Sequence, residues 1–401
     1  MSSTSLFSTA LPADVGMSAQ RLDRLRLVLQ SEIDRKRLPG AVALIARRGK
    51  VALFEALGQQ DPVAGTPMAR DSMFRIYSMT KPIVSVAVMM LLEQGRLLLG
   101  DPVSKYLPEY ATQQVAVERH GSVELQAAVS GATVQDLLRH TAGLTYEFLG
   151  MSAVQRQYGA VRIGSRERSN AEFSQALAAL PLIAPPGSVW EYSRATDVLG
   201  RLTEVLGGQA LGDFLREHIF IPLGMHETGF WVAPEHHHRI AEPFARDPEG
   251  GVAMALFDPR QRPQMESGGG GLVSTAMDYA RFLQFMLNRG ELGGVRLLGP
   301  RIVDWMTADH LGAIPVNPHS GSATLLTPGH GFGLGFAVRT APGLASVPGS
   351  VGSYFWGGMA GTTFFVDPAQ DLFALMMVQA PNQRELYRQL FRDLVYAALL
   401  D

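Results

Sequence analysis

The sequence predicts an α/β fold of the α+β kind: an antiparallel sheet flanked by terminal helices, with an inserted all-helical lobe. Strand-like apolar runs occur in the first 60 residues and again after residue 330, and helix-like patterns dominate the stretch between them. The simplest packing brings the two ends together in one sheet. We therefore expect an α/β domain formed by residues 1–76 and 265–401, with a mainly helical domain, 77–264, between its two parts.

The N-terminal part begins with a helix and continues with a strand hairpin. Apolar residues at helical spacing follow Ser18 and continue to about Arg37, where Pro39-Gly40 ends the pattern. Two short apolar runs, 41–46 and 51–56, are separated by a polar, glycine-containing turn. This arrangement is typical of two buried strands joined as a hairpin.

The middle part predicts mostly helices. The apolar run 83–92 indicates a buried helix, and Thr133 with Asp136 forms a capping box before a short one. Residues 195–206 and 211–219 also have helical spacing, whereas the polar stretch 110–132 supports no assignment.

The C-terminal part returns to strands. An amphipathic helix is predicted over 275–288. Residues 331–338, 361–366 and 372–378 are strand-like, and a final helix covers 384–400.

Composition excludes several function classes. The net charge is −2, which gives no general case for binding nucleic acid. No run of 18 apolar residues predicts a membrane span, and the N-terminus lacks the basic segment of a secretory signal. We therefore expect a cytoplasmic protein. Without cysteine, the chain has no disulfides and no thiol nucleophile.

The strongest chemical signal is the Ser-x-x-Lys spacing of Ser78 and Lys81. At the start of a helix, positions i and i+3 share one face, so the hydroxyl and the amine can meet. The sequence has four lysines and 31 arginines, so lysine at this position is unusual for the chain. A desolvated lysine can lose its proton and activate an alcohol, which arginine cannot do. The alternative is a helix-capping serine beside a solvated lysine.

Two further stretches are candidates for the same chemistry. Tyr192 follows a Pro-Pro-Gly turn and can shuttle a proton if a lysine lowers its pKa, although an isolated tyrosine is far more often a core residue with a satisfied hydroxyl. Trp356-Gly357-Gly358-Met359 is expected at the entry to a strand, where glycines admit a ligand and a free N–H can hold an oxyanion. An ordinary glycine turn is the alternative.

Metal and cofactor motifs are weak. His236 to His238 is expected to lie in a solvated loop, because consecutive side chains diverge and no carboxylate stands at ligand spacing. The glycine run 267–271 lacks the lysine of a phosphate-binding loop. The Gly-x-Ser-x-Gly elbow of α/β-hydrolases does not occur. We expect no cofactor and no metal.

The order of these motifs resembles that of the serine hydrolases of the class C β-lactamase and penicillin-binding-protein superfamily, most closely the family VIII carboxylesterases. The likeness extends over nearly the whole chain. It includes 74–82, 137–144, 186–192, 222–225, 267–271, 331–336 and 356–378. The resemblance implies a β-lactamase/transpeptidase-like fold.

The resemblance also implies a role for each site residue. Ser78 is the acylated nucleophile, Lys81 lies within hydrogen-bond reach of it, and Tyr192 shuttles the proton. The backbone N–H groups of Ser78 and Met359 form the oxyanion hole.

The resemblance further implies a set of substrate-binding residues: Phe148, Arg194, Trp356, Gly357 and Gly358. At two of these positions the chain departs from lactamases and peptidases. Arg194 replaces the asparagine of the usual Tyr-x-Asn motif, and Trp356 replaces the lysine that receives a substrate carboxylate. Trp356 is instead similar to the esterase branch. With Tyr354, Phe355 and Phe148 it suggests an apolar pocket, although these rings can equally be core residues.

We therefore expect a carboxylesterase that acts on small-molecule, short-chain acyl esters. The alternatives are a β-lactamase or D-amino-acid peptidase, an acyltransferase, and a non-catalytic binding or scaffold relative.

Overall fold

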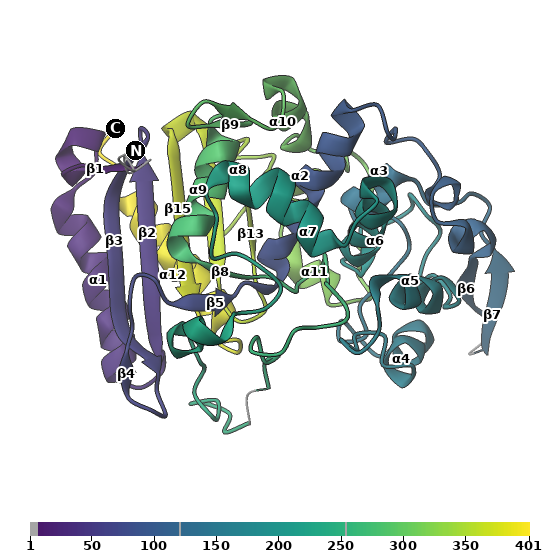
Figure 1. Ribbon diagram of the computed structural model, residues 1–401, viewed down its shortest axis with the longest axis horizontal. Coiled ribbons are helices and arrows are strands. Elements are labelled where there is room, and N and C mark those ends of the chain that lie inside the picture. The colour runs from purple at the N-terminus through teal and green to yellow at the C-terminus, as the bar shows by residue number, and fades with distance from the viewer. Residues whose placement is uncertain (1–6, 120–121, 253–254) are drawn as a thin grey trace.

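One large sheet organises the computed structural model, which describes residues 7–119, 122–252 and 255–401 (Figure 1). Its nine strands are β1 (Ser8–Thr9), β3 (Lys50–Asp61), β2 (Gly40–Arg47), β15 (Leu372–Val378), β14 (Thr363–Asp367), β13 (Tyr354–Gly357), β12 (Ala337–Arg339) and β11 (His330–Phe332), with β4 (Thr66–Pro67) beside β3. All pairs are antiparallel except β1 with β3. The predicted junction of the two chain ends is the β2–β15 pair, in register from Arg47 opposite Leu372 to Ala41 opposite Val378.

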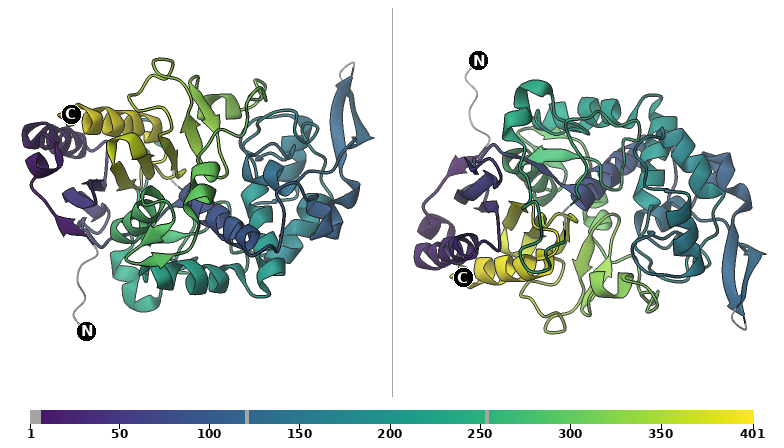
Figure 2. Two further views of the ribbon diagram at one scale, coloured as in Figure 1. Left: turned by 90° about the horizontal axis from the view of Figure 1, so that it is seen from above. Right: turned by 90° about the horizontal axis from the view of Figure 1, so that it is seen from below.

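Helices cover both faces of this sheet. The terminal helices α1 (Ala19–Asp34) and α12 (Arg384–Ala397) lie together on one face, as predicted, and α9 (Ala276–Leu287) packs on the other (Figures 1 and 2). Residues of β2 alternate between two hydrophobic cores, so Ala43 faces the terminal helices and Leu44 faces α9. Burial on both sides explains why this strand is apolar up to Ala46.

The second part of the molecule is built around α2 (Thr80–Glu93), whose residues Thr80 to Leu91 are buried. Further helices of this lobe are α3 (Val134–Leu138), α4 (Ala153–Ala160), α5 (Asn170–Ala178), α6 (Ala195–Gly207), α7 (Leu211–Leu215) and α8 (Ile221–Leu223). A π-helical turn, Arg216–Phe220, joins α7 to α8, and Thr133 makes the predicted capping box with Asp136. Because α2 packs against α6, it is the core of the lobe.

The prediction of an all-helical lobe is wrong in one place. The polar stretch left without an assignment contains a hairpin of β6 (Gln114–Arg119) and β7 (Ser122–Ala127), which projects at the end of the molecule far from the large sheet (Figure 1). The predicted strand 331–338 is also wrong as a single element, because it folds back on itself as β11 and β12.

Short elements complete the chain. A two-stranded ladder pairs β5 (Met73–Arg75) with β8 (Val273–Thr275), which holds the segment before Ser78 beside the start of α9. The remaining elements are β9 (Glu291–Leu292), β10 (Val295–Arg296), α10 (Pro300–Met306) and α11 (Ser322–Leu325).

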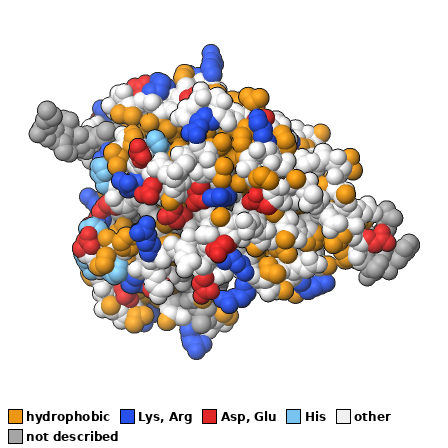
Figure 3. Space-filling model, turned by 45° about the vertical axis from the view of Figure 1, so that its right-hand side comes forward, with side chains coloured by type: hydrophobic (Ala, Val, Ile, Leu, Met, Phe, Trp, Pro, Cys, Tyr) orange, Lys and Arg blue, Asp and Glu red, His pale blue; other side chains and the backbone are white. Residues whose placement is uncertain are grey.

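The surface carries charges of both signs. Figure 3 shows basic, acidic and hydrophobic side chains interspersed over one face, in keeping with the small net charge. Within the described residues, none of the helices combines the length and hydropathy needed to cross a bilayer.

Candidate active site

Ser78 stands in a strained turn between β5 and α2. The turn is a 3-10 segment, Tyr77–Met79, and Tyr77 adopts a left-handed conformation with φ of 43°. Such a conformation is uncommon for a residue other than glycine and needs support from its surroundings. Tyr77 has this support, because its ring packs on that of Phe257 and its hydroxyl accepts from the Phe257 N–H at 3.3 Å. The turn therefore holds Ser78 in a fixed position at the floor of a pocket.

The Lys81 amine is completely buried and has three partners. Its Nζ lies 3.2 Å from Ser78 Oγ, 3.0 Å from the Tyr146 hydroxyl and 2.6 Å from the Gly269 carbonyl oxygen. Burial lowers the pKa of Lys81 to about 7; the Asp197 carboxylate opposes this shift, and the Arg194 guanidinium adds to it. A neutral amine can donate to Gly269 and Tyr146 and still direct its lone pair at the serine hydroxyl.

Tyr192 reaches the serine from the opposite side. Its hydroxyl donates to Ser78 Oγ at 2.6 Å and accepts from the Trp356 indole N–H at 3.2 Å. Burial raises the pKa of Tyr192, an effect that its hydrogen bonds to Ser78 and Trp356 only partly offset. The expectation of a lysine-lowered pKa is therefore wrong, since the buried phenol keeps its proton and can donate it.

Of the two glycines after Trp356, Gly357 lines the pocket, whereas Gly358 does not and serves the fold. Trp356 and Gly357 end β13, so the predicted strand entry is wrong: this is a strand exit. A Cβ atom on Gly358 would lie 2.4 Å from the Ile76 carbonyl oxygen, and one on Gly357 would lie 2.7 Å from the Arg388 guanidinium. Position 358 therefore needs glycine so that the chain after β13 can approach the backbone that precedes Ser78, whereas a side chain at position 357 would displace only the guanidinium of Arg388.

Met359 follows these glycines on the rim of the pocket. Its backbone N–H makes no hydrogen bond to any residue that the structure describes. This donor is available to a bound molecule.

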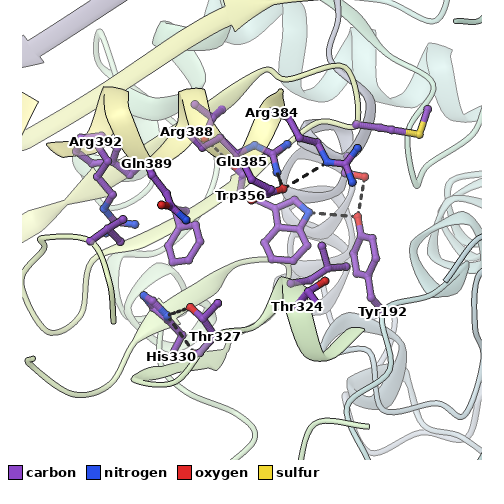
Figure 4. Close-up of a pocket in the computed structure, with 18 of the residues that line it drawn as sticks. Tyr192, Thr324, Thr327, His330, Trp356, Arg384, Glu385, Arg388, Gln389 and Arg392 are labelled. Atoms are coloured by element: carbon purple, nitrogen blue, oxygen red, sulfur yellow. Dashed lines mark hydrogen bonds and ion pairs between the residues drawn. The ribbon is translucent and has the colours of Figure 1, made fainter. Parts of the chain in front are cut away.

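The pocket beside Ser78 has a volume of about 390 Å³. Phe148, Phe355 and Trp356 line it, as the sequence suggested, and Phe148 stacks on Tyr146 with ring centroids 4.7 Å apart. Figure 4 shows Trp356 in the middle of the pocket, with Tyr192 on one side and side chains of α12 above it.

Two residues that the sequence suggested lie elsewhere. Tyr354 is buried in the core. Arg194 caps α6, where its guanidinium pairs with Glu147, lies 3.6 Å from Asp197 and stacks over the Tyr146 ring, so it does not line the pocket. Arg194 therefore borders the site from behind, through its stacking on Tyr146 and its charge near Lys81.

Sequence reasoning missed the groups that surround the amine. Tyr146 comes shortly after the 137–144 block, and Gly269 lies in the glycine run 267–271, for which the sequence suggested no role. Asp197 fixes this run by accepting from Gly269 N–H at 2.9 Å. The glycine run itself could have indicated this site. A Cβ on Gly268 would lie 2.5 Å from a backbone carbonyl of α6, so glycine is needed for the run to pack this closely against the helix.

Metal ligands do not gather in this region. In the ranges 7–119, 122–252 and 255–401, no group of three or more histidine or acidic side chains is placed to hold a metal ion. His236 to His238 lie in a 3-10 helix, Pro234–Arg239, instead of the expected loop.

A helix-flanked antiparallel sheet with a Ser-x-x-Lys turn against one of its inner strands, β13, is the arrangement of serine hydrolases of the β-lactamase fold. The chain belongs to the Beta-lactamase family, whose profile matches residues 25–397. It is 35% identical over 395 residues to Esterase EstB of Burkholderia gladioli, covering 94% of each protein.

Solved structures agree with this assignment. EstCE1, described as a hydrolase with promiscuous acyltransferase activity, superposes with a TM-score of 0.77 at 30% identity, over 94% of this chain and 98% of that one. A class C beta-lactamase shares the fold with a TM-score of 0.71 at 15% identity, over 95% and 97% of the two chains.

Proposed function

We propose that this protein is a carboxylesterase that hydrolyses short-chain acyl esters through an acyl-enzyme on Ser78. One observation carries the proposal: Ser78 Oγ lies 3.2 Å from the Lys81 amine and 2.6 Å from the Tyr192 hydroxyl. A serine between a base with a pKa of about 7 and a protonated phenol has both groups that acyl transfer needs.

In the proposed acylation, Lys81 takes the proton of Ser78 as Oγ attacks the ester carbonyl. The N–H groups of Ser78 and Met359 would stabilise the oxyanion. The ester C–O bond then breaks, Tyr192 protonates the leaving alcohol, and the Lys81 ammonium returns a proton to the phenolate.

In the proposed deacylation, a water molecule attacks the acyl carbon and gives its proton to the pair formed by Lys81 and Tyr192. The Ser78–acyl bond breaks, Oγ recovers a proton and the carboxylic acid leaves. The net reaction converts ester and water into acid and alcohol.

The similarity to Esterase EstB supports ester substrates. Trp356, in the place of the usual lysine, and Arg194, held by Glu147, give no support for β-lactam recognition. Acyl transfer to an alcohol is the second candidate, favoured by the described activity of EstCE1.

The test measures hydrolysis of p-nitrophenyl acetate and butyrate by the wild type and by Ser78→Ala. Ser85→Ala is a matched control, because Ser85 is a buried serine in α2, the helix that follows the Ser78 turn. We expect Ser78→Ala to be inactive and to resist labelling by a fluorophosphonate, while Ser85→Ala keeps both properties. An active Ser78→Ala variant would refute the proposal.

Two parallel assays separate the alternatives. Efficient nitrocefin turnover would favour a β-lactamase. Formation of a new ester when an alcohol is added would favour acyl transfer.

A further inference from the structure

The pocket continues past Trp356, away from the reactive groups. In Figure 4, Tyr192 lies on one side of the Trp356 ring, and Gln389, Arg392 and His330 lie on the other. A substrate bound at Ser78 can therefore extend along Trp356 into this distal end.

The wall formed by α12 is positively charged. Arg384, Arg388 and Arg392 are spaced four residues apart, so they share one face of the helix, and all three line the pocket. Among the described lining residues, Glu385 is the single carboxylate, and it pairs with Arg384 at 3.3 Å and Arg388 at 2.9 Å. One carboxylate against three guanidinium groups leaves this wall with an excess of positive charge, and Arg392 is the arginine without an ion-pair partner among the described residues.

Arg392 is an unusual buried cation. It is 6% exposed, yet no carboxylate of the described residues lies within ion-pair distance of it. Its NH2 group donates to Ser353 Oγ at 3.3 Å, and its Nε–H is buried without a partner in the described part of the chain. The guanidinium carbon lies 4.8 Å from the Phe355 ring centroid and 5.1 Å from that of Phe365.

Two neighbouring carboxylates, Asp367 and Asp393, attract Arg392, but neither lies within ion-pair distance of it. The Asp367 carboxylate attracts Arg392 from a greater distance, but it accepts from the Tyr396 hydroxyl at 2.6 Å and from Ser350 N–H. His330 is neutral at pH 7, since burial lowers its pKa to about 4. Aromatic faces stabilise a buried guanidinium only partly, whereas an anion bound in the pocket would complete its environment.

We propose that Arg392 makes the distal end of the pocket a carboxylate-binding subsite, so that preferred substrates are esters carrying a free carboxylate. The inference rests on the proposed esterase function. The carboxylate can belong to the acid part or to the alcohol part of the ester, and the two arms of the test distinguish these sources.

The first arm compares mono-p-nitrophenyl esters of glutaric, adipic and suberic acid with their methyl-capped, neutral counterparts. The second arm compares 4-acetoxybenzoate with its methyl ester. Each result is the ratio of kcat/KM for the anionic and the neutral substrate, and variants are compared by this ratio so that intrinsic reactivity cancels. We expect an anionic preference of about tenfold or more in one arm, the size of one charge-assisted hydrogen bond.

Three variants assign the preference to the subsite. Arg392→Met is expected to abolish it. Gln389 is exposed on the same wall, so Gln389→Glu should weaken the preference and Gln389→Lys should strengthen it even if Arg392→Met fails to fold. Arg301→Gln is the control, because Arg301 is 90% exposed on α10 and should leave the ratio unchanged.

The outcomes separate the two proposals. The subsite proposal is overturned if hydrolysis depends on Ser78 but the anionic-to-neutral ratio is near one in both arms. It is also overturned if this ratio does not change in the Gln389 variants. Either result leaves the esterase function intact. If neither class of ester is hydrolysed, the esterase function itself falls, and the subsite proposal falls with it.

Discussion

The pKa of Lys81 should govern how activity depends on pH. Burial lowers this pKa from the usual value near 10.5 to about 7, which corresponds to about 5 kcal/mol of discrimination against the charged amine. An ordinary lysine would be neutral in only about one molecule in 3,000 at pH 7, whereas Lys81 would be neutral in about half.

The expected profile follows from the fraction of neutral amine. This fraction is about 9% at pH 6 and about 91% at pH 8, so kcat/KM should rise about tenfold between them and then level off. No alkaline loss is expected below about pH 10, because burial raises the pKa of Tyr192 and keeps the phenol protonated. The assay measures kcat/KM for p-nitrophenyl butyrate from pH 5.5 to 9.5, read at the isosbestic wavelength of nitrophenol.

Two neighbouring charges should move the midpoint in opposite directions. Asp197 raises the pKa of Lys81, so Asp197→Asn should shift the rise to lower pH, whereas Arg194 lowers it, so Arg194→Gln should shift the rise to higher pH. Both side chains are buried, so circular dichroism must first show that each variant folds. Lys105→Arg, at an exposed ion pair with Asp101, is the matched control and should leave the profile unchanged.

Three results would refute this reasoning. A rate that climbs tenfold per pH unit through pH 9 would mean that the amine has an ordinary pKa. A flat profile would mean that its titration is irrelevant, and near-normal activity in Lys81→Arg would mean that a deprotonated amine is unnecessary.

Three substitutions test the parts around the serine. Tyr192→Phe removes the acid for the leaving group, and kcat should fall about a hundred- to ten-thousand-fold without loss of fold. Gly358→Ala places a Cβ 2.4 Å from the Ile76 carbonyl oxygen, so it should cost about 1–3 kcal/mol in urea unfolding and lower kcat/KM about a hundredfold. Lys81→Met should be inactive yet more stable at pH 7, because relief of about 4 kcal/mol of ionisation penalty exceeds the loss of about 1–3 kcal/mol when the Gly269 carbonyl is left unpaired. The unfolded chain holds this proton up to the usual lysine pKa, so wild-type stability rises from pH 7 to pH 10 and the stability gain of Lys81→Met should vanish by pH 10.

Local signals predicted the parts of the site that lie close together in sequence. The spacing of Ser78 and Lys81 depends only on a helix start, and the helix was evident from its apolar run. Tyr146 and Gly269 escaped notice because their contacts with Lys81 arise only when segments 65 and 188 residues away fold onto α2. A single sequence does not show which residues that are far apart along the chain come into contact in the fold.

The fold was predictable wherever periodicity was strong. The β2–β15 junction and the helices α1, α9 and α12 follow from long apolar patterns. The β6–β7 hairpin was missed, although Val115 and Val117, then Val123 and Leu125, alternate with polar residues at the period of a strand. Its valine and leucine at 123 and 125 are 42% and 49% exposed, so the weak hydrophobic signal reflects a hairpin that buries little.

The position of the site at the N-terminus of α2 follows from two opposing requirements. The amine must be kept from water to stay neutral, whereas the serine must meet a substrate and a water molecule. Ser78 lines the pocket and Lys81, one turn later, is completely buried, so the border between solvent and core passes between two residues of one helix face. Such a border needs a helix that starts beside the sheet and enters the hydrophobic core at once. Burial of Thr80 to Leu91 provides this core, which is why the apolar run after the Ser-x-x-Lys turn belongs to the chemistry as much as the two polar residues do.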